Sequence, residues 1–310
     1  FETGGSSSGS GVAVAANYAV AALGSETSGS ILSPSGKNSL VGLKPTIGAI
    51  SRSGIVPISS SMDTAGPMTK YVIDNAILMS AMTGKDTDDP SSYESLPIRF
   101  DHLDTVSFKG VRLGLNQNFE KDSLLKIAME KIKAEGAEIV LFLPPEIKMD
   151  QFRGLLDVDM RCDLPKYLNT FADPKLALDS VKDVVAFNAK DSLLHAPYGQ
   201  GIFKRITHEK RSQAEFDTTK KDIMETAKSY FKYVIDTYEL DAFISIDNYS
   251  ARNAAAAHYP ALGVPMGYTF SGQPKNLTFI ASSKKEQLLL ELGAAFERLS
   301  QSRQMPILFQ

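Results

Sequence analysis

Serine hydroxyls set between glycines are the groups in this sequence best suited to covalent chemistry. GGSSSGS occupies residues 4–10 and GSETSGSI occupies residues 24–31. The small-residue run between them predicts a tightly buried helix over 11–23, ended by Gly24. Two such loops around one helix could hold two hydroxyls close together. A nucleophilic serine needs a base and fixed donors for an oxyanion, and glycines let backbone N–H groups reach that oxyanion.

The base for such a serine is not evident among the histidines. The sequence contains four of them, with no HExxH motif and no close pair: His102, His195, His208 and His258. A serine–lysine arrangement is the alternative. Its lysine must be neutral, so burial has to lower the lysine pKa from about 10.4 towards the working pH.

Other chemistries find little support in the sequence. No GxGxxG follows a predicted strand and no GxxxxGK[ST] occurs, so nucleotide binding is not expected. GSETSG lacks the strand and elbow of a GxSxG hydrolase motif. The single cysteine, Cys162, excludes an intrachain disulfide and any multi-cysteine metal site. We therefore expect neither a metal nor an organic cofactor.

Read together, four motifs resemble the amidase signature family. That family is recognised by GGSSxGS, G[ST][DE]xxGSI, GLKPT and D[ST]xGPM in this order. The corresponding segments here are GGSSSGS (4–10), GSETSGSI (24–31), GLKPT (42–46) and DTAGPMT (63–69). The closing segment, from AHYPALGVP onward, is also similar to the family, whereas residues 146–240 carry little similarity. In the family that middle region lines the substrate pocket.

The resemblance implies a Ser–cis-Ser–Lys triad. Transferred by motif, Ser30 is the nucleophile and Ser6, on a cis peptide in relatives, is the bridging serine. The resemblance also implies that the backbone N–H groups of Thr27, Ser28 and Gly29 form an oxyanion hole. It implies that the side chains of Ser7 and Glu26 support the site. If the register were shifted by one residue, Ser7 would be the bridging serine.

The triad lysine has no counterpart in this sequence. In relatives it belongs to a KDN-type motif upstream of GGSS, and only five residues precede Ser6. Lys44 matches a position that is not the base in relatives, and Lys37 matches one that is usually apolar. The chain begins with Phe1 and shows no signal peptide. We expect the C-terminal part of an amidase, inactive by itself for want of its general base.

Three function hypotheses follow. The first is a stand-alone amidase that hydrolyses a small carboxamide. The second is a non-catalytic, amidase-like binding protein. The third is the amidase-type component of a glutamine-dependent tRNA amidotransferase, which departures from the usual pattern at Ser28, Leu32 and 37–39 make less favoured.

Three further residues receive structural interpretations. Asp63 precedes Gly-Pro in DTAGPMT and is expected to close a turn. Cys162 is interpreted as a packed small hydrophobe. His258 precedes YPALGVP and is interpreted as a surface or packing histidine.

The elements that would position these residues alternate between strands and helices. We predict a helix over 70–84 and a strand–helix–strand unit over 111–115, 120–135 and 137–143. We then predict a mostly helical stretch over 146–210 and a helix over 212–238. The rest of the chain is predicted to form strands over 241–246 and 276–282, a loop over 264–268 and a helix over 284–300. The predicted fold class is α/β, the amidase signature fold with its N-terminal part missing: a mixed, mainly parallel, twisted sheet covered by helices on both faces.

The expected organisation is a single domain fragment over 1–310. Within it, 1–84 form the signature core with the serine loops, 146–240 a helical substrate-pocket region and 241–310 the C-terminal return to the core sheet. The net charge of −3 argues against a general nucleic-acid binder. The longest uncharged apolar stretch, 11–24, is too short to span a bilayer. We expect a cytoplasmic protein with a small-molecule amide substrate, no membrane partner and an exposed sheet edge prone to self-association.

Overall fold

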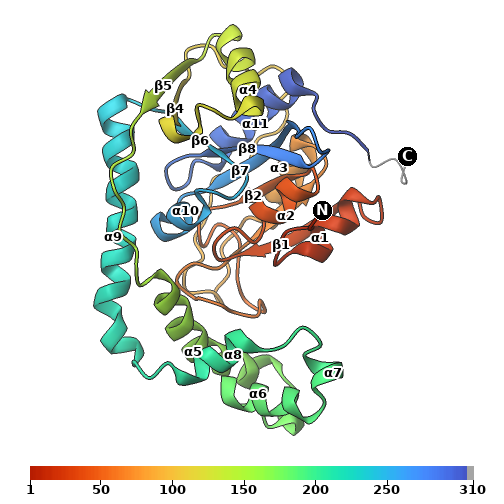
Figure 1. Ribbon diagram of the computed structural model, residues 1–310, viewed down its shortest axis with the longest axis vertical. Helices are drawn as coiled ribbons and strands as arrows, with labels where there is room; N and C mark the ends of the chain where they lie inside the picture. The colour runs from red at the N-terminus through yellow and green to blue at the C-terminus, as the bar shows by residue number, and fades with distance from the viewer. Residues whose placement is uncertain (306–310) are drawn as a thin grey trace. The chain divides into compact units, whose positions relative to one another are not determined.

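The computed structural model describes residues 1–305 and contains an eight-stranded sheet. Within these residues the strand order is β1-β3-β2-β7-β8-β6-β4-β5 (Figure 1). In chain order the strands are β1 Ala21–Glu26, β2 Val41–Lys44, β3 Thr64–Thr69, β4 Arg112–Asn116, β5 Glu138–Phe142, β6 Ala242–Ile246, β7 Ala261–Tyr268 and β8 Pro274–Ile280.

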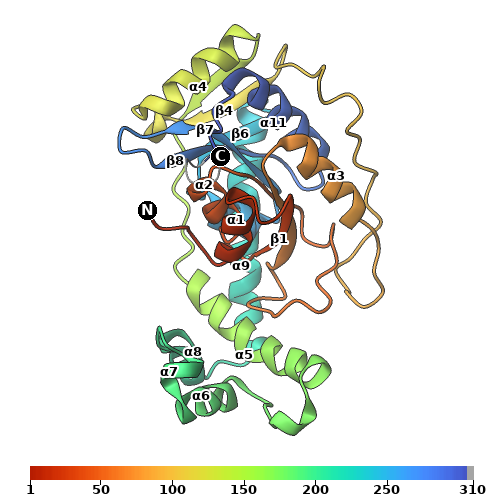
Figure 2. The ribbon, with the colours of Figure 1, turned by 90° about the vertical axis from the view of Figure 1, so that its right-hand side faces the viewer.

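Helices cover both faces of this sheet, as expected for the α/β class. Those in contact with its strands are α1 Ser8–Ala15, α2 Leu32–Lys37, α3 Val72–Met82, α4 Ser123–Ala134 and α11 Glu286–Ser300. A further short helix, α10 Ala251–Ala257, lies between β6 and β7 in the sequence. Gly42 faces Ser35 of α2, and its strand partner Gly263 faces the same side. Leu262, the residue before Gly263, points to the opposite side of the sheet and packs against Gly293 of α11. In Figure 2, α1 and α2 lie on one side of the strands, and α3 and α11 lie on the other.

The sheet is mixed, but its balance differs from the prediction. Among residues 1–305, five pairings are antiparallel (β1–β3, β2–β3, β2–β7, β6–β8, β7–β8) and two are parallel (β4–β5, β4–β6). The expectation of a mainly parallel sheet is therefore corrected. It assumed that each strand–helix–strand stretch crosses over to a parallel neighbour, whereas β7 and β8 form a hairpin and the signature strands pair with non-sequential neighbours.

The parallel part is the predicted strand–helix–strand unit. β4, α4 and β5 agree with the predicted ranges, and β4 pairs with β5 in parallel. Asp122 caps α4 because its side chain accepts the N–H of Leu125 at 2.9 Å. Local hydrophobic periodicity and a helix cap thus suffice to specify this unit.

Two local predictions are wrong. The helix expected over 11–23 ends at Ala15, Asn17 adopts a left-handed conformation (φ 64°), and 21–26 form β1. Gly24 lies in that strand, where an added Cβ would lie 2.8 Å from both Ile31 and Met68, so close packing requires the glycine. The loop expected over 264–268 is the end of β7, paired with β8 and interrupted by a bulge.

The chain forms two compact units, and the second comprises residues 53–63 and 148–226. Its helices are α5 Phe152–Phe171, η2 Pro174–Leu176, α6 Val181–Lys190, α7 Ser192–His195 and α8 Gly201–His208, with the first part of α9 Gln213–Tyr238. A small core lies among Met160, Leu164, Val181 and Ile206. The pocket-lining role of 146–240 stays a prediction.

Buried carboxylates hold the second unit together. Asp157 makes a bidentate contact with Arg205, and Asp159 pairs with Lys220 at 2.8 Å. Asp63 accepts the N–H groups of Ile58 and Ser59, both at 2.8 Å. These bonds are consistent with a structural role for Asp63 in closing a turn.

No helix within residues 1–305 combines the length and the apolar character that crossing a membrane requires.

Candidate active site

The two serine loops lie against each other at the beginning of α2. The backbone N–H of Ser7 donates to the carbonyl of Ser30 at 3.2 Å. The peptide bond between Gly5 and Ser6 is cis, the geometry that the family resemblance implied. Gly4 (φ +70°) lies so close to α2 that an added Cβ would be 2.8 Å from the Pro34 nitrogen. The backbone therefore brings Ser6 and Ser30, far apart in sequence, into one region.

Side chains on α2 and directly after it fix the segment that carries Ser6. The Asn38 amide donates to the carbonyl of Thr3 at 2.8 Å and to that of Pro34 at 2.7 Å. Lys37 pairs with Glu2 at 3.3 Å. Lys37 is thus engaged at the surface and not with the serines.

Ser7 has a different environment from Ser6. The Ser7 hydroxyl donates to the Ser25 carbonyl and accepts the Ser25 N–H, both at 3.1 Å. It thereby occupies the outer edge of β1, where Ser10 also donates to the Leu23 carbonyl at 2.7 Å. Ser6, in contrast, is exposed. The contacts of Ser7 suit it to support the segment that carries Ser6. The role of Ser6 in proton transfer stays a prediction.

Glu26 fixes the loop that precedes α2. One carboxylate oxygen, Oε2, accepts the N–H groups of Ile31 at 2.7 Å and Leu32 at 2.9 Å, directly after Ser30. The other, Oε1, is buried without a hydrogen-bond partner within residues 1–305. Burial raises the pKa of Glu26, and the N–H groups of this loop, including that of Gly29, together with Lys44, oppose the rise.

The predicted oxyanion loop is tightly held. Thr27 and Gly29 are buried, and Ser28 is half-buried. Gly29 has a φ of +105°, which favours glycine, and its carbonyl accepts the N–H of Ser33 at 2.7 Å. The three predicted donors to an oxyanion are the backbone N–H groups of Thr27, Ser28 and Gly29. The oxyanion role of all three groups stays a prediction.

Lys44 is fully buried next to this loop. Its ammonium group donates to the carbonyls of Tyr259 at 2.8 Å and Pro45 at 3.1 Å. Burial lowers its pKa to about 8, against the opposing influence of Glu26 and Glu286. These bonds connect β2 with the segment before β7, so Lys44 supports the packing beneath the site.

Asp247 and Asn248 were missed by the sequence reasoning. The Asp247 carboxylate accepts the Asn276 N–H at 2.8 Å and lies 2.7 Å from the position of a Cβ on Gly36 of α2. Asn248 lies over Gly29, its Nδ2 3.0 Å from the position of a Cβ there. The sequence signal was weak, because about 200 or more residues separate these residues from the serine motifs. A polar pair directly after a predicted strand was the available hint.

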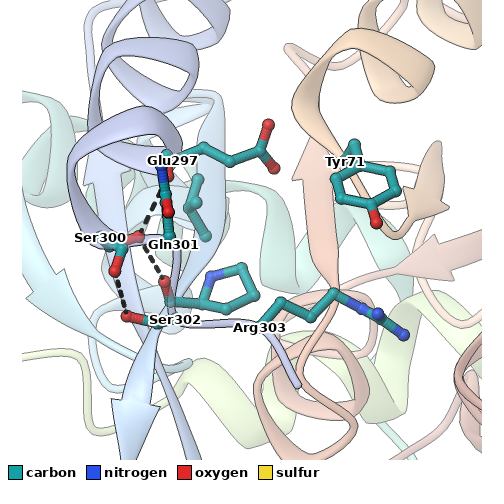
Figure 3. Close-up of a pocket in the computed structure, with 8 residues that line it drawn as sticks. Tyr71, Glu297, Ser300, Gln301, Ser302 and Arg303 are labelled. Atoms are coloured by element: carbon teal, nitrogen blue, oxygen red, sulfur yellow. Dashed lines mark hydrogen bonds between the residues drawn. The ribbon is translucent and has the colours of Figure 1, made fainter. Parts of the chain in front are cut away.

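A cavity of about 200 Å³ lies elsewhere in the first unit and includes none of the predicted site residues. Figure 3 shows the Glu297 carboxyl group extending from α11 toward Tyr71, which precedes α3. That carboxyl accepts the Val72 N–H at 3.0 Å, and burial raises its pKa to about 7. The cavity is therefore separate from the serine loops.

The remaining candidates lie outside the serine loops. His258 ends α10 in a left-handed conformation (φ 60°), and its carbonyl accepts the Ser283 hydroxyl at 2.9 Å. Cys162 lies half-buried on α5. Within residues 1–305, no three or more His, Cys, Asp or Glu side chains gather as potential metal ligands.

Comparison with known proteins gives consistent matches. A family model described as Amidase matches residues 1–194. A probable amidase of Arabidopsis thaliana is 31% identical over 97% of this chain and 61% of its own length. A glutamyl-tRNA(Gln) amidotransferase subunit of Levilactobacillus brevis is 46% identical over 42% of this chain and 27% of its own. The crystal structure of peptide amidase from Stenotrophomonas maltophilia matches with a TM-score of 0.88 and 34% identity, covering 97% of this chain.

The chain spans less than the full length of these relatives. It covers 61% of the plant protein and 66% of the peptide amidase.

Proposed function

The chain belongs to the amidase signature family, and on that premise we propose that it carries the acyl-transfer site of an amidase hydrolysing a carboxamide C–N bond. The observation that carries the proposal is the contact between the two serine motifs. The Ser7 N–H donates to the Ser30 carbonyl, and Glu26 holds the two N–H groups that follow Ser30. The nucleophile and relay residues of the proposed triad therefore lie in one fixed region.

In the proposed mechanism, the Ser30 hydroxyl attacks the carbonyl carbon of the substrate and its proton passes through Ser6 to a neutral lysine. N–H groups of the loop 27–29 stabilise the negative oxygen of the tetrahedral intermediate, and loss of one such donor typically costs about 10²–10³ in rate. The intermediate collapses by breaking the C–N bond, and the leaving ammonia or amine takes the proton. Water then attacks the acyl-enzyme and releases the acid.

The lysine of this triad is not one of the two lysines near the serines. Lys37 pairs with Glu2, and Lys44 donates to two backbone carbonyls. We propose that the lysine comes from a KDN-type segment that the 310 residues do not include, as the family resemblance implies. The 310-residue chain alone is then expected to be inactive.

The test is ammonia release from primary carboxamides by the complete gene product. Ser30→Ala is expected to lower kcat by at least about 10⁴-fold, because no other group replaces the nucleophile. The matched control is Ser229→Ala, which removes an exposed hydroxyl from α9 and should keep full activity. Unchanged turnover in Ser30→Ala would exclude Ser30 as the nucleophile.

A second candidate is the amidase-type component of a tRNA amidotransferase. It is favoured by the 46% identity to the Levilactobacillus brevis protein, which extends over 133 residues. Against it, the similarity to the plant amidase extends over 97% of this chain. Stable co-purification with partner proteins from the native source would favour the amidotransferase, and purification of an active single chain would favour the amidase.

A non-catalytic binding protein is the remaining alternative. It would keep the serine loops as a ligand site while lacking a base. Binding of amides without any ammonia release by the complete gene product would favour it.

A further inference from the structure

The carboxyl ends of two parallel strands meet beside the serine loops. β4 and β6 are parallel neighbours, with Leu113 opposite Ala242. The short helix η1 (Gln117–Phe119) follows β4, and the turn 247–250 follows β6. On its other side β6 pairs with β8 in the antiparallel direction, so the sheet changes character at this strand. In open α/β sheets, ligands bind outside the carboxyl ends of the strands.

An open aromatic pair lies at these strand ends. The rings of Phe119 and Tyr249 meet edge to face, with centroids 4.8 Å apart and planes at 86°. Tyr249 is 71% exposed, so its ring remains open to solvent. Tyr230, half-buried on α9, lies near enough for Tyr249 to contribute to the rise of its pKa to about 12, which burial mainly causes. Aromatic faces of this kind favour aromatic ligands over aliphatic ones of similar size.

Asn248 connects this aromatic pair with the predicted oxyanion loop. Its Nδ2 and Cβ lie 3.0 and 3.3 Å from the position that a Cβ on Gly29 would occupy. The residue is exposed to solvent. An amide offers both a donor and an acceptor, which matches a carboxamide or peptide group. The side chain therefore places an exposed amide next to the residue that precedes Ser30.

The turn that carries these residues is rigid. Asp247 is buried, accepts the Asn276 N–H at 2.8 Å and pairs with Lys275 at 2.9 Å. Its carbonyl accepts the Thr278 hydroxyl at 2.6 Å. Rigid support of this kind fixes the neighbouring side chains in place, as a recognition site requires.

We propose that Asn248 and Tyr249 form a substrate-recognition subsite beside Ser30, in which Asn248 hydrogen-bonds a polar group next to the scissile bond and the Tyr249–Phe119 pair holds an aromatic group of the acyl part. This inference rests on the proposed function and names its substrate class. The preferred substrates are primary carboxamides with an aryl group a few bonds from the carbonyl. Asn248 is a binding residue in this account, and it takes no part in proton transfer.

The test measures binding of neutral amides to the 310-residue chain by NMR titration, so it does not depend on turnover. The probes are 3-phenylpropanamide and butanamide. The aryl amide is expected to bind at least about tenfold more tightly, because its ring is buried against Tyr249. Tyr249→Ala should remove most of that difference. Asn248→Ala should weaken both amides by about threefold to tenfold, the effect of one lost hydrogen bond.

Two exposed residues in the second unit give matched controls. Tyr198→Ala and Asn169→Ala remove the same side-chain types and should bind both amides as the unchanged chain does. The inference is overturned if neither amide binds, if the two amides bind equally, or if Tyr249→Ala and Asn248→Ala match the controls. Failure of the proposed function is a distinct result: Ser30→Ala would release ammonia as before, while the aryl preference in binding persisted.

Discussion

The carboxylate of Glu26 holds the backbone that directly follows Ser30. It accepts two backbone N–H groups at the beginning of α2, and it is almost fully buried. A buried N–H group without an acceptor typically costs about 1–3 kcal/mol. The hydrogen bonds from the N–H groups of Ile31 and Leu32 to Glu26 therefore help to fix the position of Ser30.

Glu26→Ala should destabilise the protein and Glu26→Gln should do so much less. Alanine leaves the N–H groups of Ile31 and Leu32 without their acceptor, at a cost of about 2 kcal/mol or more. Glutamine keeps a side-chain oxygen of the same reach and so serves as the matched control. Chemical denaturation measures both. Equal losses in the two variants would contradict the assigned role.

Glu297 gives a pH-dependent prediction. Burial raises its pKa from 4.5 to about 7, so the folded state binds its proton more tightly than the unfolded state does. The stabilisation is fully present below pH 4.5 and is lost as the pH rises through 7. It amounts to about 3 kcal/mol, since one pKa unit corresponds to about 1.4 kcal/mol.

Glu297→Gln should remove this dependence while its amide oxygen still accepts the Val72 N–H. The stability difference between the two proteins, measured by denaturation from about pH 4.5 to 8, should change in favour of the variant as the pH rises. A constant difference across that range would exclude the raised pKa.

Residue identity was predictable from sequence only where residues stand in a contiguous motif. Ser6, Ser30 and Glu26 belong to glycine-rich segments whose order and spacing carry information. Asn248 reaches Gly29 only through the fold, because 219 positions separate them in the sequence. No local pattern specifies such a contact.

At the scale of secondary structure, the segment that begins α1 protects the edge of the sheet. β1 ends the strand order, and the hydroxyls of Ser7 and Ser10 bond the outward backbone groups of Ser25 and Leu23. An edge strand with satisfied groups is a poor template for pairing with another chain. The self-association expected from an exposed edge therefore finds no support at β1.

Ser7→Ala should expose the Ser25 amide to hydrogen exchange. The Ser7 hydroxyl is the acceptor of the Ser25 N–H, so its removal should raise the exchange rate of that amide by about tenfold. NMR-detected exchange measures this single amide, with Ser229→Ala as the control. Unchanged protection of Ser25 would contradict the edge contact.

Element type was predictable where one local period dominates. β4, α4 and β5 followed from alternation, a helical face and a cap. β1 did not, because its small residues suit a helix as well as a strand, and pairing with β3 decides between them. The end of β7 was missed for a similar reason, since its glycine and proline suggested a loop while β8 supplies a partner.

At the scale of the whole molecule, the two units differ in the size of their cores. The second unit buries a small cluster around Met160 and Leu164, whereas the first contains the eight-stranded sheet. Regions with few buried apolar contacts open at lower free energy.

We expect amides of α6 and α8 to exchange at lower denaturant concentrations than those of β7 and β8. Native-state hydrogen exchange in increasing guanidinium chloride would measure this. Exchange of all four elements through one common opening would show a single cooperative unit instead.

The fold class could be predicted because the sequence carries both the alternation of strands and helices and four family motifs. The balance of antiparallel pairings could not, since it depends on which distant strands become neighbours. The candidate site could likewise be predicted only in part. The sequence shows the two serine motifs, but the contact between them depends on the fold.

The most direct test of the central claim is to locate a covalent adduct on the complete gene product. The protein is treated with phenylmethanesulfonyl fluoride, digested, and the modified serine is identified by tandem mass spectrometry. We predict a single adduct on Ser30 that is absent from Ser30→Ala. An adduct on another serine, or no adduct in a protein that releases ammonia from amides, would contradict the assignment of Ser30 as the nucleophile.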